Sequence, residues 1–266
     1  GLIRSYYLTQ LQHEHVVLEQ SAKAAFNWRK RCWDSLRLVT PNCAFHRIPG
    51  VKHNHAERED FLSREKVIEF FDNYIKEFQL PIKYNSKVMS MEREGQDGYR
   101  IQTYKDNWTA KNVIVATGFC QLPKIPAFSK HISSDILQWH SSEYRNPGLI
   151  LAGAVLVVGS GHSGCQITEE LIGAGRKVFQ SIGSTGRLPR RYRGKDIIEW
   201  WEMLGLLDLS AQQLPPGMGR FDAIPQFSTS KDGNSINLHL LARSGATLLG
   251  HVMNASDNKI AFVPNL

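Results

Sequence analysis

The stretch AVLVVGSGHSGCQITEELIGAGRK, residues 154–177, decides the fold of this chain. A short apolar run ends at Gly159, and Gly161 and Gly164 complete the pattern GxGxxG. Between a strand and a helix, the first glycine makes a tight turn, the second lets a pyrophosphate approach the backbone, and the third packs helix against strand. The stretch therefore predicts a dinucleotide site whose phosphates rest on the N–H groups at the start of the helix. A glycine-rich turn without a ligand is the alternative.

The residues after this turn complete a strand–helix–strand unit. Ile167 and Leu171 share one face of the predicted helix, and the run VFQSIG, residues 178–183, is the second strand. A NAD-specific unit carries an acidic residue near the end of that strand, and this strand has none. A basic cluster follows instead, made of Arg187, Arg190, Arg191, Arg193 and Lys195. Guanidinium groups suit a phosphate, so the pattern favours NADPH over NADH, with a solvated basic loop as the alternative.

The composition is that of an ordinary soluble globular protein. The chain has 266 residues, 42% hydrophobic residues and a net charge of +7, and no apolar run is long enough to span a bilayer. We expect no signal peptide and a reduced, cytoplasmic setting, because the four cysteines show no CxxC spacing. The sequons at Asn107 and Asn254 are then accidental. No nucleic-acid motif accompanies the charge, and we expect His46, His53 and His55 to be surface residues rather than metal ligands.

The start of the chain predicts the second half of another dinucleotide unit. Residues 2–12 have a helical pattern, and the strand HVVLEQ follows and ends near Glu19. In such a unit an acid at this place takes the ribose hydroxyls. Gly1 stands where the third glycine of the fingerprint is expected, so the chain is expected to begin part-way through a domain. A plain solvated carboxylate is the alternative for Glu19.

The middle of the chain combines three patterns. Ser63 is the expected N-cap of a helix whose apolar face is Val67, Phe71, Tyr74 and Phe78. A small antiparallel meander is expected near Val88, at 99–104 beyond the turn Gln96-Asp97-Gly98, and near Trp108. The run NVIVATG, residues 112–118, is expected to be a fully buried parallel strand ending at Gly118.

The patterns together predict an α/β protein with two Rossmann-like dinucleotide-binding domains and the small meander. Residues 119–153 are expected to form a linker, and helices are expected at 196–208 and 238–245. The expected domains are residues 1–150, which bind FAD, and residues 151–266, which bind NADPH. This assignment of the cofactors follows from the family resemblance below.

Six segments, in this order along the chain, carry that resemblance: VVLEQ, WRKRCWDSLRLVTPN, VIVATGF, QWHSSEYRNP, VLVVGSGHSGCQITEEL and GRLPRRYRGKD. The chain resembles class B flavoprotein monooxygenases, in the flavin-containing-monooxygenase-like branch of bacterial FAD/NADPH oxidoreductases. The resemblance implies an FAD domain with an inserted NADPH domain. It also implies that NADPH reduces FAD and that a flavin hydroperoxide oxygenates a small organic substrate. Molecular oxygen is then the co-substrate, and a homo-oligomer is left open.

The resemblance also implies roles for individual residues. Gly1 and Glu19 serve the adenosine end of FAD, Val88 faces its adenine, and Thr117 and Gly118 lie near its pyrophosphate. Along the flavin lie Trp28, Arg29, Thr40 and Asn42, and Asn42 is the candidate for a catalytic polar contact, with a turn residue after Pro41 as the alternative. The NADPH pyrophosphate is held by Gly159, Ser160, Gly161, His162, Ser163 and Gly164. The 2′-phosphate is taken by Ser181, Arg187 and Arg190.

The sequence departs from the family in places that leave alternatives open. The two leading glycines of the FAD unit and the return into the FAD domain are missing from these 266 residues. The Baeyer–Villiger fingerprint FxGxxxHxxxW is not matched, because Ser129 and Lys130 follow Phe128 without the glycine, and Tyr144 takes the place of the tryptophan after His140. This favours heteroatom oxygenation, or an unassigned oxidation, over ester formation from ketones. The alternatives are a pyridine-nucleotide-disulfide-type oxidoreductase, which needs a cysteine pair beside the flavin, and a nucleotide-binding remnant without catalysis.

Overall fold

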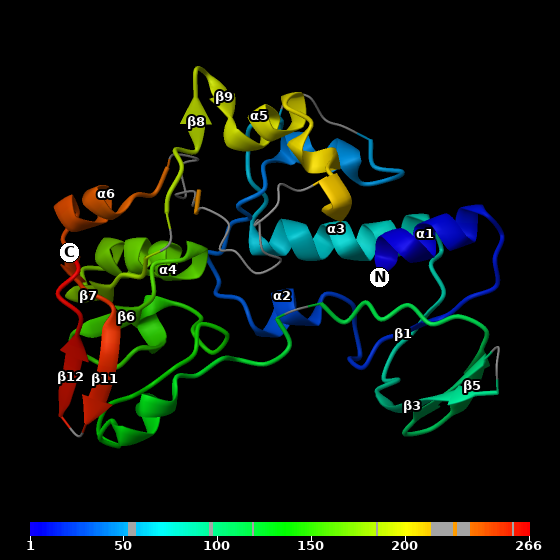
Figure 1. Ribbon diagram of the computed structural model, residues 1–266, viewed down its shortest axis with the longest axis horizontal. Coiled ribbons are helices and arrows are strands. Elements are labelled where there is room, and N and C mark those ends of the chain that lie inside the picture. Colours follow the sequence, from blue (N-terminus) through cyan, green and yellow to red (C-terminus); the bar gives the residue numbers. More distant parts are fainter. Residues whose placement is uncertain are drawn as a thin grey trace. The chain divides into compact units, whose positions relative to one another are not determined.

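The computed structural model describes residues 1–52, 57–95, 98–118, 120–184, 186–213, 226–227, 235–256 and 258–266 (Figure 1). The chain divides into two compact units. Unit 1 comprises Gly1–Arg31, Ile48–Val51 and Glu65–Pro123, and unit 2 comprises Cys32–Arg47, Lys52–Arg64 and Lys124–Leu266. The predicted boundary near residue 150 stays a prediction.

Three helices and a pair of short parallel strands form the first part of unit 1. They are α1 (Leu2–Gln10), β1 (Val17–Leu18), α2 (Phe26–Lys30), α3 (Arg64–Glu77) and β2 (Ile82–Lys83). β1 pairs with β2 in parallel, with Val17 opposite Ile82. The predicted helix after Ser63 is confirmed as α3, and Val67 and Tyr74 on its apolar face are buried.

Aromatic edges join α1 to α3. The ring of Phe78 lies 4.7 Å from the ring of Tyr6 and 4.8 Å from that of Tyr74, centroid to centroid. Gly50 passes beside these rings with a φ of +79°, and a Cβ there would lie 2.9 Å from the Tyr6 ring. Only glycine fits this position without moving the rings.

The predicted meander is confirmed. It consists of β3 (Val88–Glu94), β4 (Gly98–Thr103) and β5 (Asn107–Ala110), antiparallel in the order β3-β4-β5. Ile101 is buried at its centre, opposite Met91 on one side and Trp108 on the other. Of the predicted turn, Gln96 and Asp97 lie outside the described residues, and Gly98 begins β4.

The prediction of a buried strand at residues 112–118 is wrong for this structure. This segment belongs to no strand, and Val113, Ile114 and Val115 are 36%, 58% and 71% exposed. An apolar run becomes a buried parallel strand only where neighbouring strands pair with it. In the described part of unit 1, the parallel pairing is confined to β1 and β2.

Unit 2 is built on the predicted strand–helix–strand unit (Figure 1). β6 (Val155–Val158), β7 (Val178–Ser181) and β10 (Thr247–Leu249) form a parallel sheet in the order β10-β7-β6. Between β6 and β7 runs α4 (His162–Gly173), whose residues Ile167 and Leu171 are buried as the helical pattern predicts, and Cys165 is buried as well. The helix at 238–245 is confirmed as α6 (Leu238–Arg243), which packs Leu241 against Cys165.

The remaining elements of unit 2 are short. They are the 3₁₀ turns η1 (Asn42–Arg47), η3 (Ala127–His131), η4 (Pro147–Leu149), η5 (Leu206–Asp208) and η6 (Ala211–Gln213), the strands β8 (Arg191–Tyr192), β9 (Lys195–Asp196), β11 (Val252–Ser256) and β12 (Lys259–Phe262), and the helix α5 (Ile197–Met203). The predicted helix at 196–208 is therefore α5 followed by η5. Over the described residues of 120–153 the expected irregular segment holds only η3 and η4.

A hairpin returns the chain so that Asp196 meets Arg190. β8 and β9 pair in antiparallel fashion, and the two turn residues Arg193 and Gly194 both have positive φ, as a tight hairpin turn requires. The Nε of Arg190 then lies 2.6 Å from a carboxylate oxygen of Asp196, and neither side chain is more than 6% exposed. Asp196 is also the N-cap of α5, where it forms a capping box with Glu199.

Arg190 joins several segments of unit 2 through this buried position. Its Nη1 donates to the carbonyl oxygens of Val39 and Phe227. Its guanidinium carbon lies 4.6 Å from the centroid of the Phe61 ring and 5.4 Å from that of the Phe227 ring. Burial lowers the pKa of Arg190, and Asp196 opposes that effect. A buried charge is tolerated only when it is paired and hydrogen-bonded in this way.

We predict that Arg190→Ala destabilises the protein far more than Arg191→Ala. Removing Arg190 leaves Asp196 buried without its partner, at an expected cost of about 3–5 kcal/mol in the free energy of unfolding. Arg191 is the matched control, because its ion pair with Glu59 is exposed and should contribute about 1 kcal/mol or less. Urea unfolding of both variants measures the difference, and equal losses would contradict the structural role of Arg190.

Candidate functional site

The glycine turn between β6 and α4 has the geometry that the sequence predicts. Gly159 has a φ of +104°, and Gly161 is the N-cap of α4. A Cβ on Gly164 would collide with the carbonyl oxygen of Gly159 and lie 3.1 Å from its carbonyl carbon. The third glycine therefore lets the first turn of α4 lie directly against the loop, which aims the N–H groups of the helix at the space beyond the strand end.

Strand β7 and the residues that follow it hydrogen-bond to this turn. The N–H of Gly159 donates to the carbonyl oxygen of Ser181 at 3.0 Å, and the N–H of Gly183 donates to the hydroxyl of Ser160 at 3.1 Å. Gln180 is fully buried, and its amide donates to the carbonyl oxygen of Gly159 at 3.4 Å. The backbone of the turn is thus held by neighbours that are themselves fixed in the sheet.

Arg187 is the cationic residue that lies against the turn. Its Nη2 donates to the carbonyl oxygen of Ser160 and, at 2.8 Å, to the sulfur of Cys165. Its Nη1 is buried and has no hydrogen-bond partner among the described residues. The side chain therefore brings a positive charge to the glycine loop and keeps one donor unused.

The other two residues predicted for the 2′-phosphate have partners inside the protein. The hydroxyl of Ser181 is buried, donates to the carbonyl oxygen of Gly250 at 2.8 Å and accepts from the N–H of Val252 at 3.2 Å. Arg190 is fully buried against Asp196. Ser181 would have to give up these bonds to contact a phosphate, whereas the buried Nη2 of Arg190 has no hydrogen-bond partner among the described residues. The assignment of both residues stays a prediction.

Gln226, which sequence reasoning missed, lies at the start of α4. Its Oε1 accepts a hydrogen bond from the N–H of His162 at 3.0 Å. The backbone of Gln226 bonds to the basic segment on both sides of Arg187, at Gly186 and Leu188, with 2.9 Å in each bond. No local pattern marks this glutamine, since it lies 64 residues from its partner along the chain.

His162 begins α4 with a half-buried imidazole. The ring of Phe227 meets it edge-on at 5.2 Å between centroids. Burial lowers the pKa of His162, and the positive charges of Arg187 and Arg190 lower it further. The imidazole is therefore neutral at neutral pH, and the positive charge at this end of α4 comes from Arg187.

The residues predicted for FAD lie in part together within unit 1. Gly1 is the N-cap of α1, and a Cβ there would lie 3.7 Å from the Cβ of Ala116. Thr117 and Gly118 follow Ala116 directly, and Gly118 has a φ of +75°. The start of α1 and a glycine turn therefore meet, as a pyrophosphate site of this type requires.

Glu19 follows the carboxyl end of β1, where ligands bind in such sheets. Its carboxylate accepts from the N–H of Ser21 at 2.8 Å and from the hydroxyl of Ser21 at 2.6 Å. These bonds set the direction of the carboxylate.

The other predicted FAD residues have varied surroundings. In unit 1, Trp28 is half-buried in α2, the Nη2 of Arg29 lies 2.6 Å from the carboxylate of Asp72, and Val88 is an exposed residue at the start of β3. In unit 2, Thr40 is half-buried and Asn42 begins η1.

Asn42 has an unused acceptor. Its side-chain amide donates to the carbonyl oxygen of Glu57 at 2.9 Å, and its backbone N–H donates to that of Asp60 at 2.9 Å. The Oδ1 atom is buried and has no hydrogen-bond partner among the described residues. A buried acceptor without a donor is costly, which makes this oxygen a candidate for contact with a bound group.

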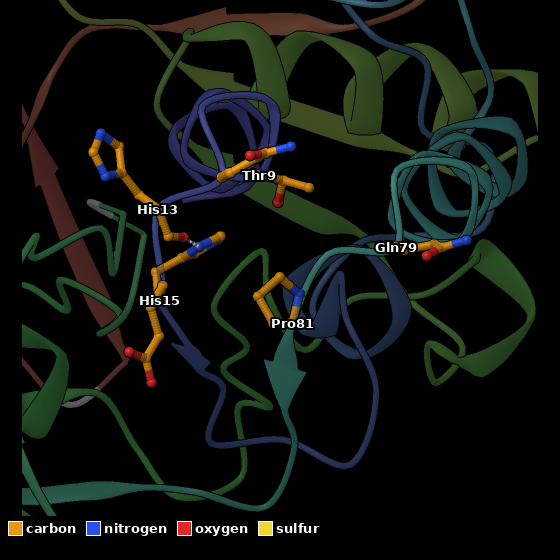
Figure 2. Close-up of a pocket in the computed structure, with 7 residues that line it drawn as sticks. Thr9, His13, His15, Gln79 and Pro81 are labelled. Carbon is orange, nitrogen blue, oxygen red and sulfur yellow. Dashed lines mark hydrogen bonds between the residues drawn. The ribbon is translucent and has the colours of Figure 1, made fainter.

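A hollow of about 360 Å³ in unit 1 lies at the amino end of β1, opposite the end that Glu19 follows (Figure 2). It is lined by Thr9, Gln12, His13, Glu14, His15, Gln79 and Pro81. His15 and Pro81 precede β1 and β2, so the hollow faces the amino ends of these parallel strands. Dinucleotides bind at the carboxyl ends, and no residue predicted for a cofactor lines this hollow.

The cysteines and histidines form no metal site in the described part of the chain, where no cluster of three or more His, Cys, Asp or Glu could hold an ion. His46 instead lies 2.6 Å from the carboxylate of Glu202, and His53 and His55 are outside the described residues. None of the four cysteines forms a disulfide bond. Across the described ranges, no helix combines the length and the apolar character needed to cross a membrane.

Residues 1–200 match the family described as pyridine nucleotide-disulphide oxidoreductase. The chain belongs to this family. A curated relative from Geobacillus kaustophilus, described as an uncharacterized CzcO-like oxidoreductase, is 32% identical over 274 residues, which cover 100% of this chain and 76% of the relative. The probable indole-3-pyruvate monooxygenase YUCCA1 of Arabidopsis thaliana is 28% identical over 177 residues, or 65% of this chain and 42% of that protein.

Solved structures show the same fold. A flavin-containing monooxygenase from Stenotrophomonas maltophilia superposes with a TM-score of 0.64 at 21% identity, over 96% of this chain and 75% of that one. A structure of OTEMO in complex with FAD and NADP has a TM-score of 0.57 at 17% identity, over 71% of this chain and 38% of that one.

These comparisons confirm the resemblance to flavin-containing monooxygenases at the level of family and fold. The predicted α/β class with Rossmann-like dinucleotide-binding domains is confirmed as well. The protein is an oxidoreductase of a flavoprotein family, and FAD and NAD(P) are the cofactors of that family. The individual site residues stay predictions.

Proposed function

We propose that this protein is an NADPH-dependent flavoprotein monooxygenase. In the overall reaction, NADPH, a proton, O₂ and a small organic substrate yield NADP⁺, water and the oxygenated substrate. Bound FAD would supply the oxygen chemistry, and the protein would bind, orient and exclude water. The observation that carries the proposal is the glycine turn, where the close approach of Gly164 to Gly159 and the charge of Arg187 fit a phosphorylated dinucleotide.

The NADPH half of the proposal rests on unit 2. Residues 159–164 would hold the pyrophosphate through backbone N–H groups, because Gly161, the N-cap of α4, has no side chain of its own to bond to them. Of the three residues predicted for the 2′-phosphate, Arg187 lies against the glycine turn through the carbonyl oxygen of Ser160, whereas Ser181 bonds to Gly250 and Arg190 pairs with Asp196. We therefore assign the phosphate to Arg187.

The FAD half rests on unit 1. Gly1 would contact the pyrophosphate and Glu19 the ribose, since Gly1 is the N-cap of α1 and Glu19 follows β1. Thr117 and Gly118 would also contact the pyrophosphate, since they follow Ala116, which lies beside Gly1. Roles for Trp28, Arg29, Thr40 and Val88 along FAD are proposed on the resemblance alone.

Asn42 is the proposed catalytic contact. Its unpartnered Oδ1 would accept a hydrogen bond from a bound group and so orient that group. The unmatched Baeyer–Villiger fingerprint favours a substrate oxygenated at a heteroatom. Four cysteines without a disulfide bond fit a reducing, cytoplasmic setting.

The second candidate function is a disulfide-type oxidoreductase, which the family description keeps open. That chemistry needs a reactive thiolate. Burial, with Glu199 and Asp196, raises the pKa of Cys43 to about 11, and burial also raises the pKa of Cys165. Both thiols are therefore protonated at neutral pH, which argues against disulfide chemistry at these two cysteines.

We predict that Arg187→Ala raises the Michaelis constant for NADPH by about 10- to 100-fold, the scale of a lost hydrogen bond to a charged group, and leaves that for NADH nearly unchanged. Steady-state kinetics with both cofactors measure this discrimination. Arg193→Ala is the matched control, because Arg193 is an exposed arginine of the same cluster. Equal losses with NADPH and NADH would show that Arg187 supports the glycine turn instead of the 2′-phosphate.

We predict that Glu19→Ala weakens FAD binding by about 1–3 kcal/mol, because the ribose hydroxyls lose their acceptor. Fluorescence titration of the apoprotein with FAD gives the dissociation constant. Glu14→Ala serves as the control, since Glu14 is an exposed acid before the same strand. Unchanged FAD affinity in the Glu19 variant would remove this residue from the site.

We predict that flavin reduction by NADPH survives removal of all four thiols. The variant carries Cys32→Ser, Cys43→Ser, Cys120→Ser and Cys165→Ala, where alanine avoids a polar group at the buried position. Anaerobic stopped-flow absorbance measures the reduction rate, and circular dichroism confirms folding. Loss of reduction in a folded variant would support the disulfide oxidoreductase.

A further inference from the structure

The carboxamide oxygen of Gln226 lies where the start of α4 offers its first hydrogen-bond donor. It accepts from the N–H of His162 at 3.0 Å, and a Cβ on Gly161 would lie 3.7 Å from the same oxygen. N–H groups at this point of a GxGxxG turn are the ones that a dinucleotide phosphate uses. Gln226 and a phosphate therefore need the same donor.

The backbone of Gln226 is held firmly enough to keep its side chain there. The N–H of Gln226 donates to the carbonyl oxygen of Gly186, and its own carbonyl oxygen accepts from the N–H of Leu188, each at 2.9 Å. These two bonds form a parallel bridge with Arg187, whose guanidinium reaches the carbonyl oxygen of Ser160. Gln226 and Arg187 are thus paired through their backbones, and the side chain of each reaches the glycine turn.

The chemistry of the amide explains why glutamine suits this place. An amide oxygen accepts the bond of a helix N–H without bringing a charge. A carboxylate there would be held by the helix dipole and would repel a phosphate. Arg187 is the cation facing the turn, and the neighbouring His162 is neutral because burial lowers its pKa.

We propose that Gln226 is an internal competitor for the dinucleotide phosphate and sets the affinity of the site for NADP(H). The oxygen of Gln226 gives up the N–H of His162 when a phosphate oxygen takes it, so each binding event breaks one hydrogen bond. This inference rests on the proposed function, because it assigns Gln226 a part in the same site.

Removing the competing oxygen should tighten binding. We expect Gln226→Ala to lower the dissociation constant of NADP⁺ by about two- to tenfold, the range that corresponds to one net hydrogen bond. We expect Gln226→Glu to raise it, and to do so less at high salt, because its effect is electrostatic. Isothermal titration calorimetry of the full chain with NADP⁺ measures both constants without any turnover.

Gln138→Ala is the matched control. Gln138 is an exposed glutamine of unit 2 whose amide donates to the carbonyl oxygen of Ser129 at 3.1 Å, and its loss should leave NADP⁺ binding unchanged. Thermal melts confirm folding of each variant. Gln226→Met, similar in length and without the acceptor, repeats the test if Gln226→Ala fails to fold.

The results of these titrations distinguish failure of the proposed function from failure of the proposed competition by Gln226. Failure of the unsubstituted protein to bind NADP⁺ would overturn the proposed function and this inference with it. Binding that is equal in the unsubstituted protein and in the alanine, methionine and glutamate variants would overturn the competition alone. Weaker binding by Gln226→Ala or Gln226→Met would also overturn it, because the carboxamide would then support the ligand.

Discussion

The contact between Gly164 and the carbonyl of Gly159 is the constraint on which unit 2 depends. Any side chain at Gly164 would push the first turn of α4 away from the loop, because the collision is with backbone. The parallel pairing of β6 with β7 holds the loop from the other side, through the bond from Gly159 to Ser181. The direction of the N–H groups of α4, and the places of Arg187 and Gln226 beside them, follow from this approach.

A second constraint, the hairpin of β8 and β9, gives neighbouring arginines of the sequence different environments in the fold. Arg187, Arg190 and Arg191 belong to one basic cluster, yet each lies in a different environment. Arg187 contacts the glycine turn, Arg190 is buried against Asp196, and Arg191 is an exposed partner of Glu59. The hairpin of β8 and β9 produces this division, because it returns Asp196 to Arg190. A cluster of charge is therefore a poor guide to which of its members binds a ligand.

Membership of the family and the shared fold do not by themselves choose between monooxygenase and disulfide chemistry, because function resides in the site. The observations that bear on the choice are local. Cys43 and Cys165 have raised pKa values, and within the described part of the chain Arg187 keeps a donor and Asn42 a buried acceptor without a hydrogen-bond partner. These features fit a protein that binds and orients cofactors better than one that exchanges thiols.

The sequence by itself determined the features that depend on neighbouring residues. The glycine turn, the buried face of α4 with Ile167 and Leu171, and the antiparallel meander all follow from spacing and turn chemistry within a few positions. Tertiary structure alone decided the rest. Residues 113–115 are as apolar as a core strand and are exposed, because burial requires strands to pair with them. Gln226 reaches His162 across 64 residues, and Arg190 pairs with Asp196 because of a hairpin, so both contacts depend on how distant segments pack and no local pattern records them.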